Sequence, residues 1–251
     1  PQLSMQYLGF HQGFSLYNVG FTAGIVGMVV LGFLNAFGIE VETKTLANTE
    51  SPLILYGLLI GLCLILLATS FYLHVQKKEK YHFKLLLKLS GRLPSDFVEM
   101  TNLATVTFNM SIMGFILLSY VLINGGQLNG PIVGSIIGAM SFGAFGNQVK
   151  NTVPVLVGIM IGCYLTGVDV ASTSALVAAI FGTTLAPVSG YYGPLAGVIA
   201  GFVHITLVSH VVVMHGGLNL YNNGFAGGFV AAVLVPIFEI FEGIRQDIKE
   251  R

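Results

Sequence analysis

The same peptide occurs twice in this chain, near its two ends. Residues 11–26 read HQGFSLYNVGFTAGIV and residues 215–230 read HGGLNLYNNGFAGGFV, with identical residues at nine of the sixteen positions. Each copy opens a long apolar, glycine-rich run, so a Tyr-Asn cluster stands at the mouth of a membrane-length segment. Such repetition is typical of internally duplicated transporters and channels. We therefore expect the end of one structural copy and the whole of another, as in the C-terminal part of a longer protein.

Few residues in the chain carry a charge. Charged residues make up 9%, hydrophobic residues 54%, and the mean hydropathy is +0.82, whereas a soluble domain carries about 25% charged residues. This composition predicts an integral membrane protein, which we expect in a bacterial cytoplasmic membrane. The formal net charge is zero, so no nucleic-acid partner is expected. Cys63 and Cys163 lie in apolar stretches and are typical of packing residues, so we expect no metal site and no cofactor.

Eight apolar segments can be marked along the chain. About 20 residues are needed to cross ~30 Å of hydrocarbon, and the first three and last two segments meet that length. The middle three are short and interrupted by Gly, Pro, Asn and Lys, which is typical of half-helices, re-entrant hairpins or broken helices; full spans with polar ends are the alternative. The predicted fold is an all-α polytopic membrane bundle. Its segments are 17–38, 53–75, 103–123, 131–145, 153–166, 171–187, 194–214 and 218–241.

The positions of Lys and Arg predict the orientation in the membrane. The loop over residues 76–92 holds six of them and should be cytoplasmic, whereas the preceding loop, with Glu40, Glu42 and Glu50, should lie outside. Counting spans from there, the two copies of the repeated peptide enter the membrane from opposite sides. We therefore expect inverted repeats related by a pseudo-two-fold axis in the membrane plane, with a binding site at their interface.

These expectations divide the chain into three units. Residues 1–52 form the end of a first repeat, residues 53–99 a span followed by a basic cytoplasmic linker, and residues 100–251 a second repeat. In the linker, residues 81–89 read YHFKLLLKL and place Leu and Phe on one helical face and Lys on the other. This pattern predicts a short amphipathic helix on the anionic inner leaflet. Its role is either that of a gate or docking helix, or that of a plain topology anchor.

The strongest candidate for a functional site is the repeated LYNxGF cluster. Asn offers a donor and an acceptor, Tyr supplies an amphipathic ring with a hydroxyl, and Gly lets the backbone approach a solute. These groups suit a small polar solute that has lost its water. The alternative is structural, with Asn capping the helix and Tyr marking the membrane interface. The candidate residues in the two copies are Tyr17, Asn18, Tyr221, Asn222 and Asn223.

Two further clusters lie in the middle of the chain. In residues 145–158, Asn147, Lys150 and Asn151 precede Pro154, which suits the first turn of a helix; Lys150 either attracts anions inside the bundle or is a topology charge in a cytoplasmic loop. In residues 181–194, the hydroxyls of Thr183 and Thr184 precede a Pro- and Gly-rich break. They either line a constriction or belong to an ordinary turn.

The sequence resembles an uncharacterised bacterial family of two-repeat multispanning membrane proteins. The motifs that carry this resemblance are HGGLNLYNNGFAGGFVAAVLVP, its partner near the N-terminus, SFGAFGNQVKNTVPVLVG and SGRLPSDF. A more distant likeness links the chain to urea transporters, which also duplicate a unit with Gly, His and a Tyr-Asn-Gly run. Here one residue separates Tyr-Asn from Gly, so the chain departs from that pattern. The motifs occupy residues 215–236, 11–33, 141–158 and 90–97.

Together these features predict a transporter or channel for a small polar, neutral solute. We expect membrane lipids, the solute, and the missing first part or another chain of an oligomer as partners. The alternative is a non-transporting scaffold or sensor that docks a partner through its basic cytoplasmic loop. No nucleophile elbow, phosphate loop or dinucleotide fingerprint is present in the sequence, so we do not expect an enzyme.

Overall fold

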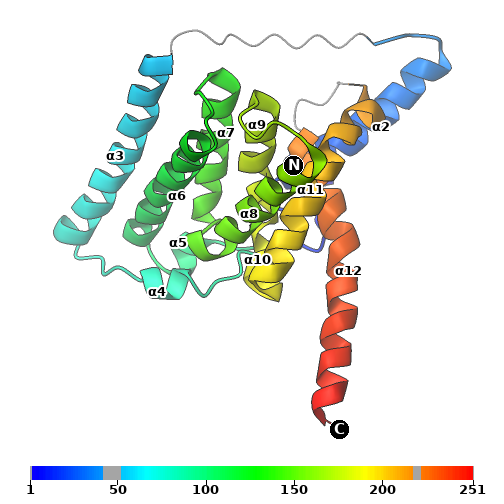
Figure 1. Ribbon diagram of the computed structural model, residues 1–251. Helices are drawn as coiled ribbons and strands as arrows, with labels where there is room; N and C mark the ends of the chain where they lie inside the picture. The colour runs from blue at the N-terminus through cyan, green and yellow to red at the C-terminus, as the bar shows by residue number, and fades with distance from the viewer. Residues whose placement is uncertain (1, 42–51, 217–221, 251) are drawn as a thin grey trace.

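The computed structural model describes residues 2–41, 52–216 and 222–250, and every regular element in these ranges is a helix (Figure 1). In chain order the α-helices and the 3₁₀ turns (η) are α1 (Gln2–Tyr7), α2 (Asn18–Ala36), α3 (Pro52–Gln76), α4 (Phe83–Leu86), α5 (Phe97–Met100), α6 (Leu103–Ile123), α7 (Gly130–Ser141), η1 (Phe142–Ala144), α8 (Val149–Thr166), α9 (Thr173–Gly182), η2 (Thr183–Leu185), α10 (Ala186–Tyr192), α11 (Pro194–His215) and α12 (Asn222–Glu250).

Seven helical stretches in the described ranges are long and apolar enough to cross a membrane. They are Asn18–Ala36, Leu53–Gln76, Leu103–Ile123, Val149–Thr166, Thr173–Tyr192, Pro194–Val211 and Asn222–Ile244. The stretch Gly130–Ala144 is apolar but shorter. The chain is therefore an all-α polytopic membrane protein, as its hydropathy predicts.

The three short segments predicted in the middle of the chain take three different forms. The first is the short helix α7 with the turn η1. The second is a full-length span, α8, because its helix begins at Val149, ahead of the predicted residue 153. The third belongs to a broken span, in which α9 and α10 are the two halves and η2 separates them. Only this third segment places a helix break near the middle of a membrane-length stretch.

Polar side chains fix where α8 begins. The Gln148 side chain accepts a hydrogen bond from the Lys150 backbone N–H (2.6 Å), and the Asn151 side chain accepts one from the Gln148 backbone N–H (2.9 Å). These two bonds form a capping box, which satisfies backbone donors that a helix start leaves unpaired. The helix ends at Thr166, and the residue that follows it, Gly167, has a φ of +71°, which suits glycine.

The basic loop lies at one end of the bundle. In Figure 1, α4 and α5 lie at the same end as the C-terminal end of α12, whereas the turns between α6 and α7 and before α9 lie at the opposite end. This one-sided placement agrees with the positive-inside rule.

The amphipathic helix predicted over residues 81–89 is shorter in the structure. Only the single turn α4 is helical there, and the side chain of Leu86 is fully buried. The side-chain amide of Gln148 donates to the carbonyls of Leu87 (3.4 Å) and Leu89 (3.3 Å). Because these carbonyls bond to a buried side chain of another element, the helix stops and the segment docks on its own bundle.

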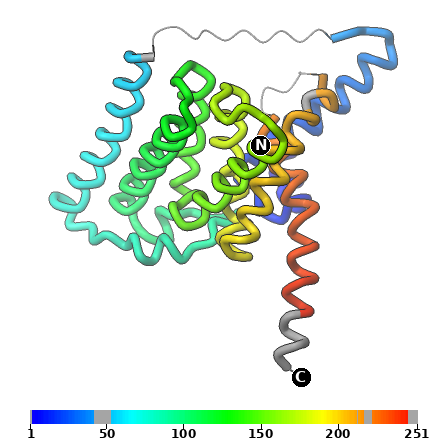
Figure 2. Tube along the Cα trace, viewed as in Figure 1, coloured from blue at the N-terminus to red at the C-terminus, as the bar shows by residue number. Residues whose placement is uncertain are grey.

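The two copies of the repeated peptide lie in α2 and α12 and in the stretches that precede them. These two helices pack against each other near their N-terminal ends and then leave the contact in opposite directions (Figures 1 and 2). At the contact, the backbone at Gly20 lies so close to Gly224 that a side chain on Gly224 would overlap it. The small residues of the motif therefore permit the close approach of two membrane helices.

Equivalent residues of the two copies make equivalent contacts. Gly24 packs on the ring of Phe225, and its counterpart Gly228 packs on the ring of Phe21. The two Phe rings lie against each other, with their centroids 6.2 Å apart. Exchanging one copy for the other leaves this set of contacts unchanged.

The histidines that open the two copies also make equivalent contacts. The ring centroid of His11 lies 5.4 Å from that of Phe21, and the ring centroid of His215 lies 5.7 Å from that of Phe225. Both histidine side chains are fully buried. In both copies, therefore, the opening histidine packs on the phenylalanine of the same motif.

Candidate functional site

The break between α9 and α10 is the centre of the candidate site. The turn η2 interrupts a stretch of membrane length about halfway along, and all three of its residues, Thr183, Thr184 and Leu185, are fully buried. A helix break leaves backbone groups without their usual intrahelical partners, and at membrane depth such groups must be satisfied by protein or by a water-filled cavity. The side chains around η2 are therefore the candidates for a functional site.

On one side of the break lies the non-helical stretch that precedes α2. The Leu16 backbone N–H donates to the carbonyl of Thr184 (3.0 Å), and the Tyr17 N–H donates to the Thr184 hydroxyl (2.8 Å). The hydroxyls of Ser15 and Thr184 lie 3.1 Å apart, within hydrogen-bonding distance, and both side chains are fully buried. The first copy of the repeated motif is thus bonded directly to the break in the later part of the chain.

His11 orders the start of α2. Its Nδ1 accepts a hydrogen bond from the Ser15 N–H (3.3 Å), so the ring proton sits on Nε2, which donates to Asn18 Oδ1 (3.0 Å). The Asn18 side-chain amide in turn donates to the carbonyl of Ser4 (2.6 Å). Burial lowers the pKa of His11 below its ordinary value, although the hydrogen bond to Asn18 opposes this. The ring is therefore a neutral, fixed tautomer.

On the other side of the break lie two buried asparagines. The Asn147 amide donates to the carbonyl of Ala139 (3.2 Å) and to the Thr183 hydroxyl (3.0 Å). The Asn109 amide donates to the carbonyls of Gly143 (2.8 Å) and Asn147 (2.8 Å). Because a carbonyl only accepts, these contacts fix which atom of each carboxamide is nitrogen.

The oxygens of these two carboxamides remain available. Among the residues that the structure describes, neither Asn109 Oδ1 nor Asn147 Oδ1 has a hydrogen-bond partner, and both side chains are fully buried. A buried polar group without a partner costs roughly 1–3 kcal/mol. Two acceptors beside one helix break therefore suit a molecule that donates hydrogen bonds.

A histidine of α11 reaches the break from a third direction. Gly182, the last residue of α9, lies against the ring of His204, and a side chain at this glycine would overlap the ring. His204 Nε2 donates to Asn223 Oδ1 of α12 (3.3 Å). Both residues are buried. The break is thereby connected to the second copy of the repeated motif as well as to the first.

The structure brings together most of the predicted site residues. Thr183 and Thr184 form the break, and Asn147 and the backbone of Tyr17 bond to it directly. The Tyr17 ring packs at 5.3 Å from the ring of Phe181 in α9. Asn18 and Asn223 join the cluster through His11 and His204, whereas Asn222 lies at the start of α12 beside His215. Tyr221 is outside the described residues.

Two predicted site residues lie elsewhere. Asn151 caps α8 and donates to the carbonyls of Ser90 (3.1 Å) and Gly146 (2.8 Å), so its groups are occupied in holding the basic loop. Lys150 is exposed beside it and lines a cleft of about 280 Å³ together with Lys88. This position beside the basic loop fits a topology charge, the alternative role for Lys150.

Four residues at the break are not among the predicted site residues. His11 and Ser15 belong to the repeated peptide, and Asn109 is a carboxamide inside a membrane-length apolar segment, a signal that favours a buried role. The sequence favours a packing role for His204. What the sequence could not supply is how these residues reach η2, because the partners of Ser15 and Asn109 are 169 and 38 positions away. Ser15 bonds to η2 directly, whereas His11, Asn109 and His204 reach it through Ser15, Asn147 and Gly182 respectively.

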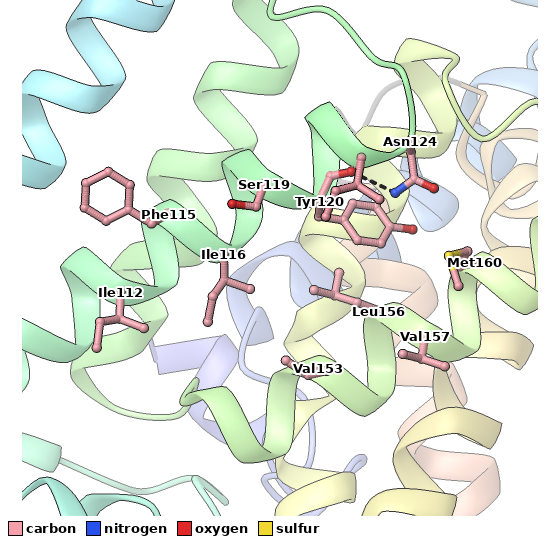
Figure 3. Close-up of a pocket in the computed structure, with 11 residues that line it drawn as sticks. Ile112, Phe115, Ile116, Ser119, Tyr120, Asn124, Val153, Leu156, Val157 and Met160 are labelled. Carbon is pink, nitrogen blue, oxygen red and sulfur yellow. Dashed lines mark hydrogen bonds between the residues drawn. The ribbon is translucent and has the colours of Figure 1, made fainter.

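The broad groove in Figure 3 is separate from this site and shares none of its residues. It lies between α6 and α8, has a volume of about 450 Å³, and its walls are mainly aliphatic and aromatic. The amide of Asn124 at its rim donates to the carbonyl of Tyr120 in its own helix (2.7 Å). An apolar groove between membrane helices suits a lipid acyl chain, not a polar solute.

Comparison with known proteins places the chain in a family. Residues 1–36 and 75–240 match the family described as "Protein of unknown function (DUF1576)", so the chain belongs to this family. Residues 37–74, which include nearly all of α3, lie outside the match. No curated protein and no solved structure matches the chain.

Proposed function

We propose that this member of the DUF1576 family is a membrane transporter or channel for a small polar solute, which passes at the η2 break. The observation that carries the proposal is the pair of unpartnered oxygens of Asn109 and Asn147 beside a broken membrane helix. Polar groups at membrane depth are expensive and, where they persist, commonly mark substrate pathways. Broken helices are also where many transporters place their sites.

The chemistry of the break favours a neutral solute that donates hydrogen bonds. The groups described there are carboxamides, hydroxyls, backbone amides and neutral imidazoles, and the hydrogen bonds that join them do not involve Asp, Glu, Lys or Arg. Without a countercharge, an ion would enter this site at a high desolvation cost. Urea, ammonia and other small amides or amines have the required donors.

The described arrangement corresponds to a closed path. Ser15, Thr184 and Asn147 have no exposed surface, so a solute would enter only when the stretch before α2 separates from η2. That separation exchanges the bonds from Leu16, Tyr17 and Ser15 to Thr184 for bonds to the solute. Such an exchange between two hydrogen-bonded states is what alternating access around a fixed site requires.

The scaffold alternative finds less support in the contacts. It needs a basic loop that is free to dock a partner, but the described backbone of this loop is bonded to Gln148 and Asn151. The guanidinium of Arg92 also lies 4.5 Å from the ring centroid of Phe14 in the chain's own N-terminal stretch. The lysine side chains remain exposed, as expected of a topology signal.

Removing one hydroxyl at the break tests the proposal. In liposomes that contain the purified protein, we expect flux of at least one solute from a panel of urea, ammonia, glycerol and simple anions. Thr183→Val keeps the shape of the side chain but removes the acceptor for Asn147, so we expect it to slow that flux by about tenfold, which corresponds to about 1.4 kcal/mol. Flux is read by light scattering for neutral solutes and by a pH- or anion-sensitive dye for the others.

The matched control is Thr166→Val. The Thr166 hydroxyl donates to the carbonyl of Gly162 in its own helix (2.7 Å), far along α8 from the break. This variant should transport as the wild type does. Absence of flux for every solute, or equal rates for Thr183→Val and the wild type, would contradict the proposal and favour the scaffold.

A further inference from the structure

Corresponding positions of α2 and α12 differ in exposure. Every residue of one copy has a counterpart 204 positions away in the other, so the two helices can be compared face by face. One face is buried in α12 but exposed in α2, whereas another face is exposed in both. On the first face the exposed fractions are Val19 63% against Asn223 8%, Val26 42% against Val230 1%, and Val30 43% against Leu234 8%; on the second they are Val29 65% against Val233 58%.

The broken span and its neighbour cover this face of α12. Gly227 packs on the side chain of Thr184 in η2, and Asn223 bonds to His204 of α11. The helices α9, α10 and α11 all contact α12. The burial of Val230 and Leu234 therefore comes from the unit that contains the helix break.

The equivalent face of α2 lines an open, apolar groove instead. The groove has a volume of about 820 Å³, and its lining includes Val19, Ala23, Val26 and Val30 together with residues of α1. Ala23 is the counterpart of Gly227, so it stands where a turn like η2 would pack. Figure 1 shows the outer part of α2 projecting away from the rest of the bundle.

Helix α1 covers part of this face of α2. Its residues 2–7 correspond to residues 206–211, the last turns of the membrane span in α11. Tyr7 packs on Phe21, with ring centroids 6.5 Å apart, and its counterpart Val211 belongs to the same buried cluster as Phe225. Helix α1 contacts α2, and α11 contacts α12.

We infer that the groove on α2 is the docking surface for a second helical unit with the fold of residues 173–215. This unit lies on the same polypeptide and runs into α1, as α11 runs into the stretch before α12. Its own break packs on Ala23 as η2 packs on Gly227. A local two-fold axis near Phe21 and Phe225, where Gly24 packs on Phe225 and Gly228 packs on Phe21, then relates two complete units. The last helix of each copy completes its own unit.

This inference stands on packing alone and does not depend on transport. It also has a geometric consequence for the site, because the axis places two helix breaks on the two sides of the α2–α12 contact. Each break would then be bonded to the repeated peptide of the opposite copy, as η2 is bonded to Ser15 and Tyr17.

Photo-cross-linking in the membrane tests the inference. The protein is expressed from its complete reading frame with an aliphatic diazirine residue at one of four positions: Val26, Val29, Val230 or Val233. The residue is small enough to replace valine without filling the groove. After irradiation, the adducts are identified by mass spectrometry as lipid, own chain or other protein.

Val230 and Val233 calibrate the experiment, because the first is buried against the broken span and the second is exposed. We expect Val26 to behave as Val230 does, with loss of lipid adducts and a cross-link to a peptide of its own chain upstream of residue 1. Val29 should give lipid adducts, as Val233 does. Lipid adducts at Val26 equal to those at Val29, or a cross-link from Val26 to a separate polypeptide, would overturn the inference.

Discussion

Leucine in place of Gly158 or Gly201 is expected to disrupt the bundle more than the loss of any single hydrogen bond. At Gly158 even a β-carbon would overlap the backbone of Val198, and at Gly201 it would overlap the carbonyl of Val155. A backbone carbonyl cannot rotate away as a side chain does, so α8 and α11 must separate. Overpacking of this kind costs about 1–3 kcal/mol or more, and here it also opens the contact beside η2.

Two small-residue stripes explain why this contact is so close. Gly158 and Gly162 lie four residues apart in α8, as do Gly197 and Gly201 in α11, and such spacing allows membrane helices to meet backbone to backbone. The loss of stability in the leucine variants is measured as a fall in the midpoint of thermal unfolding in detergent. Size-exclusion chromatography follows.

Leucine at Gly57 is the control for these variants, since a β-carbon there meets no atom within 4 Å. We expect the Gly57 variant to unfold at the wild-type temperature. If leucine at Gly158 and leucine at Gly57 gave the same midpoint, the backbone-to-backbone packing of α8 on α11 would be wrong.

Asn147→Leu is expected to abolish solute flux. The substitution removes one of the two unpartnered oxygens and leaves the Ala139 carbonyl and the Thr183 hydroxyl without their donor. Each buried group left unpaired costs roughly 1–3 kcal/mol. We therefore expect both a lower thermal midpoint and a loss of flux greater than that of Thr183→Val.

A second variant separates these two effects. Asn109→Leu also removes one unpartnered oxygen, but it leaves the bond between Asn147 and Thr183 in place. Asn124→Leu is the matched control, because the Asn124 amide bonds only within its own helix in the described part of the chain. Flux that persisted in the Asn147 and Asn109 variants at the rate of the Asn124 variant would exclude the two carboxamides from the path.

The helical architecture follows from hydropathy because each membrane helix satisfies its own backbone hydrogen bonds. The sequence also indicated a helix break near Thr183 and Thr184, although it was expected in the Pro- and Gly-rich run after them. In the structure η2 includes both threonines, whereas Pro187 and Gly190 are helical. The repeated peptide likewise indicated where α2 and α12 begin. These features depend on residues close together in the sequence, so the sequence alone can predict them.

Other features depend on contacts between distant elements. The helix predicted over residues 81–89 stops at one turn because Gln148 bonds to its carbonyls from another element. Asn151 is among the predicted site residues, but in the structure its amide holds the basic loop through Ser90. A side chain with both a donor and an acceptor can serve either use, and only its neighbours decide between them.

The proposed transport requires that the buried break at Thr184 belong to a path that opens to water, and a single cysteine at this position tests that requirement. In a background with Cys63→Ala and Cys163→Ala, Thr184→Cys is exposed to a small, hydrophilic methanethiosulfonate reagent during transport in liposomes. We expect this thiol to react although Thr184 has no exposed surface in the closed arrangement, and we expect flux to stop as it reacts. A thiol at position 184 that stays unreacted while solute flux continues would contradict this requirement.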